Sequence, residues 1–356
     1  MSWRLSVCVL VSVAIGCSDG TSPLSRPPSP AESAAALPVD PTISVRIAPN
    51  LDGNNITVTG FNRYDNITGY VTTGSTSRVF RSRTSIQYFT PPAGIQPGNF
   101  FGIHAGINDF GQVAGGVIND TSQRAYIWWA GGGSTLLPPA VPLDEPGQPL
   151  GCGAWAISDS GYVVGTCMPN VNWFAAEWRP DGTMIKDACC GVLTAIAENQ
   201  YLTGYDLKFD PPIALLWPPG ASYYTLIGLN NGQMEQSEGL AVNVNGWVAG
   251  YAVVTGTDQS AILWVPGQPQ RILSHLGSAT GVDTWGNVVG YHRDTPTGPT
   301  TAFLWNFATG AHFLPGLPGG GATAAVAINN INPEILGWAI DANGTKHTVI
   351  WTFHRT

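Results

Sequence analysis

Four cysteines lie close together in the middle of the chain, and they carry the clearest covalent chemistry. They are Cys152, Cys167, Cys189 and Cys190. Their spacings match no common zinc motif, so a four-cysteine zinc site is the lesser alternative to disulfides. A turn sequence between the first two places them almost opposite each other on paired strands. We expect the bridges Cys152–Cys167 and Cys189–Cys190, or instead a separate bridge from each of the first two to the adjacent pair.

The residues that could carry acid–base chemistry are scattered. The histidines form no H-x-H or H-E-x-x-H motif, and a lone histidine is more often structural. Asp109, Asp159 and Asp283 recur in the turn region of their units, where such side chains bond to the nearby backbone, and this explains them without acid–base chemistry. No glycine-rich phosphate loop is present. The sequence therefore predicts no catalytic residue, no metal site and no cofactor.

Residues 1–17 are typical of a bacterial export signal. A single positive charge at Arg4 precedes the apolar run Leu5–Ile15, which is shorter than the roughly 20 residues that a membrane span needs. The run ends in the sequence AIGC, which resembles a lipobox and implies a lipid on Cys17; the alternative is an ordinary secretory signal. Residues 18–41 are rich in Ser, Pro and Ala without an aromatic residue, which predicts a disordered tether. We expect a lipoprotein of the outer membrane, cell surface or extracellular space, where disulfides form.

The composition favours a large apolar core with many turns. The chain has 44 Gly and 28 Pro, yet also 13 Trp, 11 Tyr and 12 Phe, a load of aromatic residues that disordered chains lack. The net charge of −8 argues against a nucleic-acid partner, which basic patches would favour. One small basic group, Arg78, Arg81 and Arg83, is interpreted as a solvated strand face.

A hairpin followed by an apolar strand recurs seven times. Each hairpin closes on a glycine, and the copies are 39 to 50 residues apart: Gly69, Gly115, Gly165, Gly204, Gly250, Gly290 and Gly337. In six copies the apolar strand ends in a tryptophan: Trp128, Trp178, Trp217, Trp264, Trp305 and Trp351. Arg81 takes this place in the first copy.

These units predict an all-β, seven-bladed β-propeller over residues 42–356. One more apolar stretch after each tryptophan makes four antiparallel strands per unit, and units of this length are blades. We expect the tryptophans to pack between blades. The chain ends after the third strand of the last unit, so we expect Thr42–Ala48 to supply its outer strand and to close the ring of a monomer.

The units of the form A-x-x-I-N-x-x-G-x-V-x-G followed by A-F-L-W resemble the HAF repeat family of probable extracellular bacterial proteins. The match is closest at Ile107–Gly115 and Ala302–Trp305. This resemblance implies export and a repeat array, with no established ligand or reaction. The hairpins also resemble regulator-of-chromosome-condensation repeats, which lack the A-F-L-W strand.

The longest loops are expected on one face of the ring, together with the cysteines. They are Pro138–Gly151, Met168–Phe174, Lys208–Pro212 and His292–Thr300. Trp173, Phe174 and Phe209 lie on them and are candidate contacts for a glycan or protein ligand. We therefore expect a non-catalytic binding or scaffold propeller of the cell envelope. The alternative is a secreted hydrolase or lyase with its site at the channel mouth on this face.

Overall fold

The computed structural model describes residues 39, 42–74, 76–90, 105–119, 122–138, 151–168, 173–228, 235–255 and 258–354. The predicted signal 1–17 and nearly all of the predicted tether 18–41 lie outside this range. By its contacts the chain divides into residues 1–36 and residues 37–356, and the second unit is described below. The described residues form 28 strands and no helix, and hence no helix that could cross a membrane.

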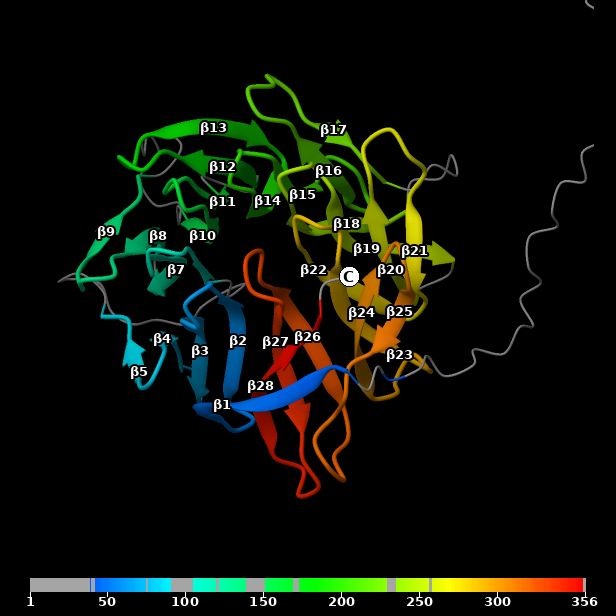
Figure 1. Ribbon diagram of the computed structural model, residues 1–356. Helices are drawn as coiled ribbons and strands as arrows, with labels where there is room; N and C mark the ends of the chain where they lie inside the picture. Colours follow the sequence, from blue (N-terminus) through cyan, green and yellow to red (C-terminus); the bar gives the residue numbers. More distant parts are fainter. Residues whose placement is uncertain are drawn as a thin grey trace, which may run out of the picture. The chain divides into compact units, whose positions relative to one another are not determined.

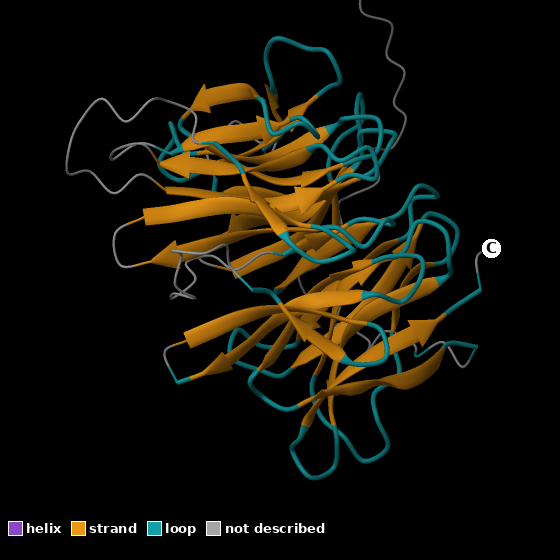
Figure 2. Ribbon diagram, turned by 90° about the vertical axis from the view of Figure 1, so that its left-hand side faces the viewer, coloured by secondary structure: helices purple, strands orange, loops and turns teal. Residues whose placement is uncertain are grey.

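The strands form seven four-stranded antiparallel blades in a ring, which confirms the predicted seven-bladed propeller (Figures 1 and 2). The inner strands are β2 (Ile56–Phe61), β6 (Gly106–Ile107), β10 (Gly151–Ile157), β14 (Gly191–Ile196), β18 (Ser237–Val242), β22 (Gly277–Val282) and β26 (Thr323–Ile328). The second strands are β3 (Ile67–Thr73), β7 (Val113–Asn119), β11 (Val163–Met168), β15 (Leu202–Asp206), β19 (Val248–Thr255), β23 (Val288–Arg293) and β27 (Glu334–Ile340). The third strands are β4 (Thr76–Ser82), β8 (Ser122–Trp128), β12 (Phe174–Trp178), β16 (Ile213–Trp217), β20 (Asp258–Trp264), β24 (Thr300–Asn306) and β28 (Lys346–Thr352). The outer strands are β5 (Ile86–Tyr88), β9 (Ser134–Leu136), β13 (Met184–Cys189), β17 (Thr225–Leu226), β21 (Arg271–Ser274), β25 (Gly310–Phe313) and β1 (Ser44–Asp52).

The repeated glycine is required by a β-bulge in the facing inner strand. Six of the inner strands shift register by one residue, as β2 does between Val58 and Gly60. Next to the bulge, an inner-strand carbonyl oxygen points at the glycine of the second strand. A Cβ atom would collide with that oxygen at six glycines: Gly69, Gly165, Gly204, Gly250, Gly290 and Gly337. At these six positions the repeated glycine in the sequence therefore marks the position of a bulge in the facing inner strand.

The repeated tryptophans pack inside the ring, as expected. All six are at most 9% exposed. In blade 3 the indole Nε1 of Trp178 donates to the carbonyl of Pro138, which follows the outer strand of blade 2. In blade 7, Trp351 donates in the same way to Pro315, which follows the outer strand of blade 6. Each of these two side chains thus ties its blade to the one before it.

Arg81 is buried, so its interpretation as part of a solvated face was wrong. It stands in the place of the tryptophan and is 8% exposed, whereas Arg78 and Arg83 are exposed. Its guanidinium donates to the carbonyls of Gly111 and Ala130 and lies 4.6 Å from the ring centre of Trp128, all in blade 2. The planar guanidinium of Arg81 therefore stacks on an aromatic ring and donates hydrogen bonds at the position that a tryptophan indole occupies in the other blades.

Turn-to-turn hydrogen bonds join each blade to the next on the face that carries the turns between inner and second strands, here called the turn face. Asn62 shows the pattern, since its Oδ1 accepts from two N–H groups of its own turn while its Nδ2 donates to the carbonyl of Asn108 in blade 2. Asn243 does the same toward Asp283. Asparagine suits this position because its side chain is both acceptor and donor. All seven junctions carry at least one such bond.

The N-terminal strand closes the ring, as predicted. Strand β1 pairs antiparallel with β28, from Ser44 opposite Thr352 to Asp52 opposite His347. It runs to Asp52 instead of ending at Ala48, because a register shift after Ile47 turns Leu51 inward again. Ala48 and Leu51 are each 1% exposed and enter the core that blade 7 shares with blade 1.

Truncating Leu51 should weaken this closure. Replacing Leu51 with Ala leaves a cavity in a buried cluster, so we expect the free energy of unfolding to fall by about 3 kcal/mol and the melting temperature by about 6 °C. Ile47→Ala is the matched control, because Ile47 lies on the same strand and is 45% exposed. Equal melting temperatures for the two variants would show that β1 does not hold the ring closed.

A histidine joins the end of β1 to blade 7. His347 Nδ1 lies 2.8 Å from Asp52 Oδ1, and its Nε2 lies 3.0 Å from Asp341 Oδ2. Hydrogen bonds to Asp341 and Asp52 raise the pKa of His347 above its ordinary value of 6.5. The protonated ring can donate to both carboxylates at once, so the contact is strongest when the histidine is charged.

The stability of the ring should therefore depend on pH through His347. Because its pKa is raised on folding, its contribution is full below about pH 6.5 and is lost as the pH rises through the raised value. Asp52 is half exposed, so the effect should stay below about 1 kcal/mol. Thermal melts from pH 6 to pH 9 should show a fall in the wild type that His347→Gln lacks; parallel curves would contradict this.

Candidate functional site

A cavity of about 720 Å³ occupies the centre of the ring. Every blade contributes to its wall, and six of the lining residues stand at the inner-strand bulges: Thr59, Trp155, Thr194, Leu240, Thr280 and Val326. A cavity of this size is in the range that holds a drug-sized ligand. In these six blades the bulge therefore places one residue of the inner strand in the lining of the channel.

Three threonines give the wall of this channel its polar character. Thr59 Oγ1 donates to the carbonyl of Ala105 at 2.7 Å, Thr194 Oγ1 to Gly239 at 2.6 Å, and Thr280 Oγ1 to Ala325 at 3.0 Å. Each of these bonds joins one blade to the next. Because the hydroxyl protons are already used, the oxygens have lone pairs left to accept from a ligand. The wall is thus matched to ligands that donate hydroxyl protons.

Aromatic side chains line the cavity toward the face opposite the turns, here called the long-loop face. Tyr70, Tyr291 and Trp338 come from second strands of blades 1, 6 and 7, and Trp155 comes from the inner strand of blade 3. All four are partly exposed. Sequence reasoning missed this group, although the signal was present. An aromatic residue directly follows the strand-closing glycine in five copies: Tyr70, Tyr205, Tyr251, Tyr291 and Trp338.

Among the described residues that line the cavity, Arg293 is the one charged residue, and none is an Asp, Glu, His, Lys or Cys. A carboxylate lies nearby on the inner strand of blade 5, but outside the lining. Burial raises the pKa of this group, Glu238, which bonds to Tyr251. Burial and the charge of Glu238 together raise the pKa of Tyr205 to about 12. The described lining of the cavity therefore offers binding groups and contains no pair for acid–base catalysis.

Three carboxylates meet at the turn face, around a second cavity of about 280 Å³. Asp109 accepts from the N–H of Arg63 at 3.0 Å, Asp159 from that of Asp109 at 2.6 Å, and Glu198 from that of Asp159 at 2.8 Å. Burial, followed by repulsion from neighbouring carboxylates, raises the pKa of Asp159 and Glu198. Since each carboxylate holds the turn of the preceding blade, this cluster is part of the ring. Asp283 likewise bonds to its own turn, at Trp285 and Asn287.

A serine, a histidine and an aspartate lie in a row between blades 5 and 6. His292 Nδ1 is 2.7 Å from Ser274 Oγ, and its Nε2 is 3.1 Å from Asp294 Oδ1. The serine hydroxyl donates to the carbonyl of His275, which also lies 2.9 Å from His292 Nδ1. The serine proton is directed at the carbonyl of His275, which His292 Nδ1 also faces, so His292 is not placed to remove that proton. Asp294 is also 88% exposed, and none of the three lines the channel.

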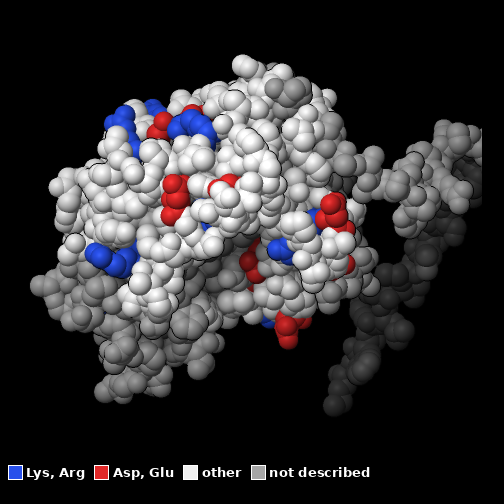
Figure 3. Space-filling view, turned by 90° about the horizontal axis from the view of Figure 1, so that it is seen from below, with Lys and Arg blue, Asp and Glu red and all other residues white. Residues whose placement is uncertain are grey.

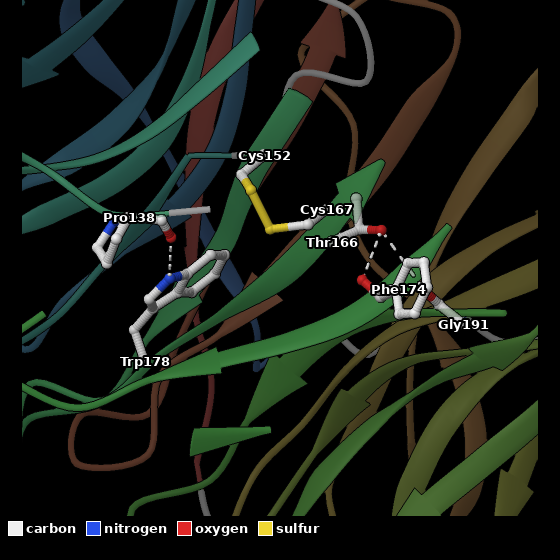
Figure 4. Close-up of a disulfide and its surroundings, with 7 residues drawn as sticks. All are labelled: Pro138, Cys152, Thr166, Cys167, Phe174, Trp178 and Gly191. Carbon is white, nitrogen blue, oxygen red and sulfur yellow. Dashed lines mark hydrogen bonds between the residues drawn. A yellow bond between two sulfur atoms is a disulfide. The ribbon is translucent and has the colours of Figure 1, made fainter. Parts of the chain in front are cut away.

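The structure confirms the first of the expected disulfides. Cys152 and Cys167 are opposite each other on β10 and β11 and are bridged (Figure 4). Cys190 is also disulfide-bonded, and its N–H donates to the carbonyl of Trp173. The side chain of Cys189 lies outside the described part, so the Cys189–Cys190 pairing stays a prediction. No group of three or more metal-binding side chains occurs among the described residues.

The predicted contact residues lie away from the channel. Trp173 is 38% exposed, while Phe174 and Phe209 are partly buried, and none of the three lines the cavity. Two aromatic side chains at the tips of turns on the turn face are more exposed: Phe110 is 63% exposed and Trp285 is 57% exposed. The exposure of these two side chains was not predicted. A turn sequence predicts the turn itself but not which of its side chains the closed ring leaves exposed.

The charged side chains are spread thinly where the surface is seen from below. Lys and Arg side chains occur singly or in small groups among Asp and Glu, on a mostly uncharged surface (Figure 3). This view shows no extended basic patch on that side. The absence of a nucleic-acid partner stays a prediction.

Known proteins share the fold of this chain at very low identity. No protein-family model and no curated protein matches it. The β-propeller domain of the Trilobed protease from Pyrococcus furiosus superposes with a TM-score of 0.50 and 12% identity, over 73% of this chain and 84% of that one. Virginiamycin B lyase from Staphylococcus aureus gives 0.49 and 8%, over 88% and 99%. The BP39L lectin from Burkholderia pseudomallei gives 0.46 and 12%, over 88% and 95%. The resemblance to HAF repeats stays a prediction, and what the comparisons add is the β-propeller fold.

Proposed function

We propose that this propeller is a non-catalytic binding module that holds a glycan at the long-loop end of its central channel. The observation that carries the proposal is the composition of the cavity wall. Aromatic faces at Tyr70, Trp155, Tyr291 and Trp338 combine with the threonine oxygens, and the described lining residues include no carboxylate and no histidine. Sugar rings present apolar C–H faces and hydroxyl donors, which this combination of groups fits.

The alternative, a hydrolase or lyase at the channel mouth, is less well supported. Such a reaction needs an acid and a base within reach of the bound substrate. The carboxylates of Asp109, Asp159 and Glu198 lie at the turn face and are bonded to backbone N–H groups. His292 lies off the channel and is bonded on both ring nitrogens. None of these groups lines the central cavity, and the three carboxylates line the turn-face cavity instead.

Binding should depend on the indole of Trp155. Removing one aromatic face costs about 1.5 kcal/mol, so Trp155→Ala should weaken glycan binding about tenfold. The full mature chain in detergent is screened on an array of cell-wall oligosaccharides, and the dissociation constants of the hits are measured by calorimetry. Trp285→Ala is the matched control, because Trp285 is exposed on the turn face. Failure of the wild type to bind any glycan, or equal loss in both variants, would refute the proposal.

We also propose that the protein is an exported lipoprotein anchored through Cys17. The lipobox-like sequence supports this, and the Cys152–Cys167 disulfide is consistent with an oxidising compartment. Residues 18–41 would separate the propeller from the membrane.

The anchor is tested by labelling bacteria that express the chain with a radioactive fatty acid. The wild type should incorporate label and fractionate with membranes, whereas Cys17→Ser should do neither. Equal labelling of both chains, or no labelling of the wild type, would contradict lipidation at Cys17.

A further inference from the structure

Arg293 stands where two hollows of the long-loop face meet. It lines the central cavity and also a smaller hollow of about 260 Å³ between blades 5 and 6, together with Tyr291. The rest of the smaller hollow is lined by Asp258, Gln259, Leu276, Gly277 and Pro296. A ligand longer than the channel can therefore continue outward past Arg293.

The backbone and an aromatic ring hold Arg293 in place, while its guanidinium stays available. Arg293 is the last residue of β23, and its N–H donates to the carbonyl of Leu276 at 2.9 Å. The guanidinium carbon lies 5.5 Å from the ring centre of Tyr291. Within the described chain the guanidinium makes no hydrogen bond and no ion pair. The side chain is nevertheless partly buried, so a cation is positioned without a partner.

Two other arginines of the ring form ion pairs with carboxylates of the protein. Arg46 pairs with Asp65 and Glu334, and Arg63 pairs with Asp109. Two acidic residues lie near Arg293 without pairing with it. Asp294 bonds to His292, and Asp258 lines the outer hollow. An anion would be repelled by Asp258, so the junction at Arg293 is the favourable place for one.

We propose that the ligand is an acidic oligosaccharide whose sugar-borne carboxylate binds Arg293. One ring would lie in the channel against Trp155 and Trp338, the acidic ring would lie at Arg293, and an uncharged ring would continue into the outer hollow beside Asp258. The planar guanidinium matches a carboxylate with two parallel hydrogen bonds, and in a partly buried site that pairing selects for charge. This proposal rests on the proposed function, because it specifies the glycan that the same channel holds.

The test compares two probes that differ only in charge. One is a tetrasaccharide with a single uronic acid among neutral sugars, and the other is the same tetrasaccharide after its carboxyl group has been reduced to a primary alcohol. The full mature chain in detergent is titrated with each by calorimetry at low and at high salt. We expect the acidic probe to bind at least tenfold more tightly than the reduced one, and this ratio to shrink at high salt.

Variants assign the preference to one side chain. Arg293→Gln should bind both probes alike, while Arg293→Lys should keep part of the preference. Arg271→Gln is the matched control, because Arg271 is exposed on the outer strand β21 and lies against Phe307. It should keep the wild-type ratio. Melting temperatures of all variants show whether each is folded.

The outcomes separate the two proposals. A wild type that binds the reduced probe as tightly as the acidic one, with both lost in Trp155→Ala, overturns the carboxylate at Arg293 and leaves the glycan channel standing. An unchanged ratio in Arg293→Gln overturns it as well. A wild type that binds neither these probes nor any glycan on the array overturns both proposals. Tighter binding of a sulfated probe than of the uronate would overturn the carboxylate in favour of sulfate.

Discussion

The ring depends on the pairing of β1 with β28, which joins the two ends of the chain in one blade. Without it, blade 7 would have three strands and an exposed edge, and blade 1 would lose the apolar contacts of Ala48 and Leu51. Every other blade is built from consecutive strands, so its sheet can form locally. Only blade 7 must bring together segments almost 300 residues apart, and ring closure is therefore the step that local folding cannot supply.

Crowding at the axis explains why the rest of the ring has its form. The inner strands bulge, an inner-strand carbonyl then points at the second strand, and only glycine leaves room for it. At the turn face, Asn62 and Asn243 satisfy their own turns and still reach the next blade. In six blades the same bulge places one residue in the lining of the channel. Packing and binding surface are thus two results of one backbone distortion.

Most of the polar groups that look reactive are used to hold blades together. Asp109, Asp159 and Glu198 accept from neighbouring turns, and His292 joins the blades 5 and 6. Arg293 differs, because it faces a cavity with aromatic walls and has no protein partner among the described residues. Side chains that are not bonded between blades, such as Arg293, are therefore better candidates for ligand contacts than the carboxylates and the histidine that join the blades.

The sequence alone predicted the number of blades and the closing strand, and it favoured the Cys152–Cys167 bridge over the alternative pairings that the structure then excluded. These follow from local rules, since glycine, turn residues and apolar strands mark each unit wherever they occur. It did not determine the site, and the chosen Trp173, Phe174 and Phe209 lie outside the channel. Tyr70, Trp155, Tyr291 and Trp338 are far apart in the chain and converge only because the ring closes. For the same reason, burial of Arg81 and availability of Arg293 were decided by tertiary structure: each depends on what a different blade places beside it.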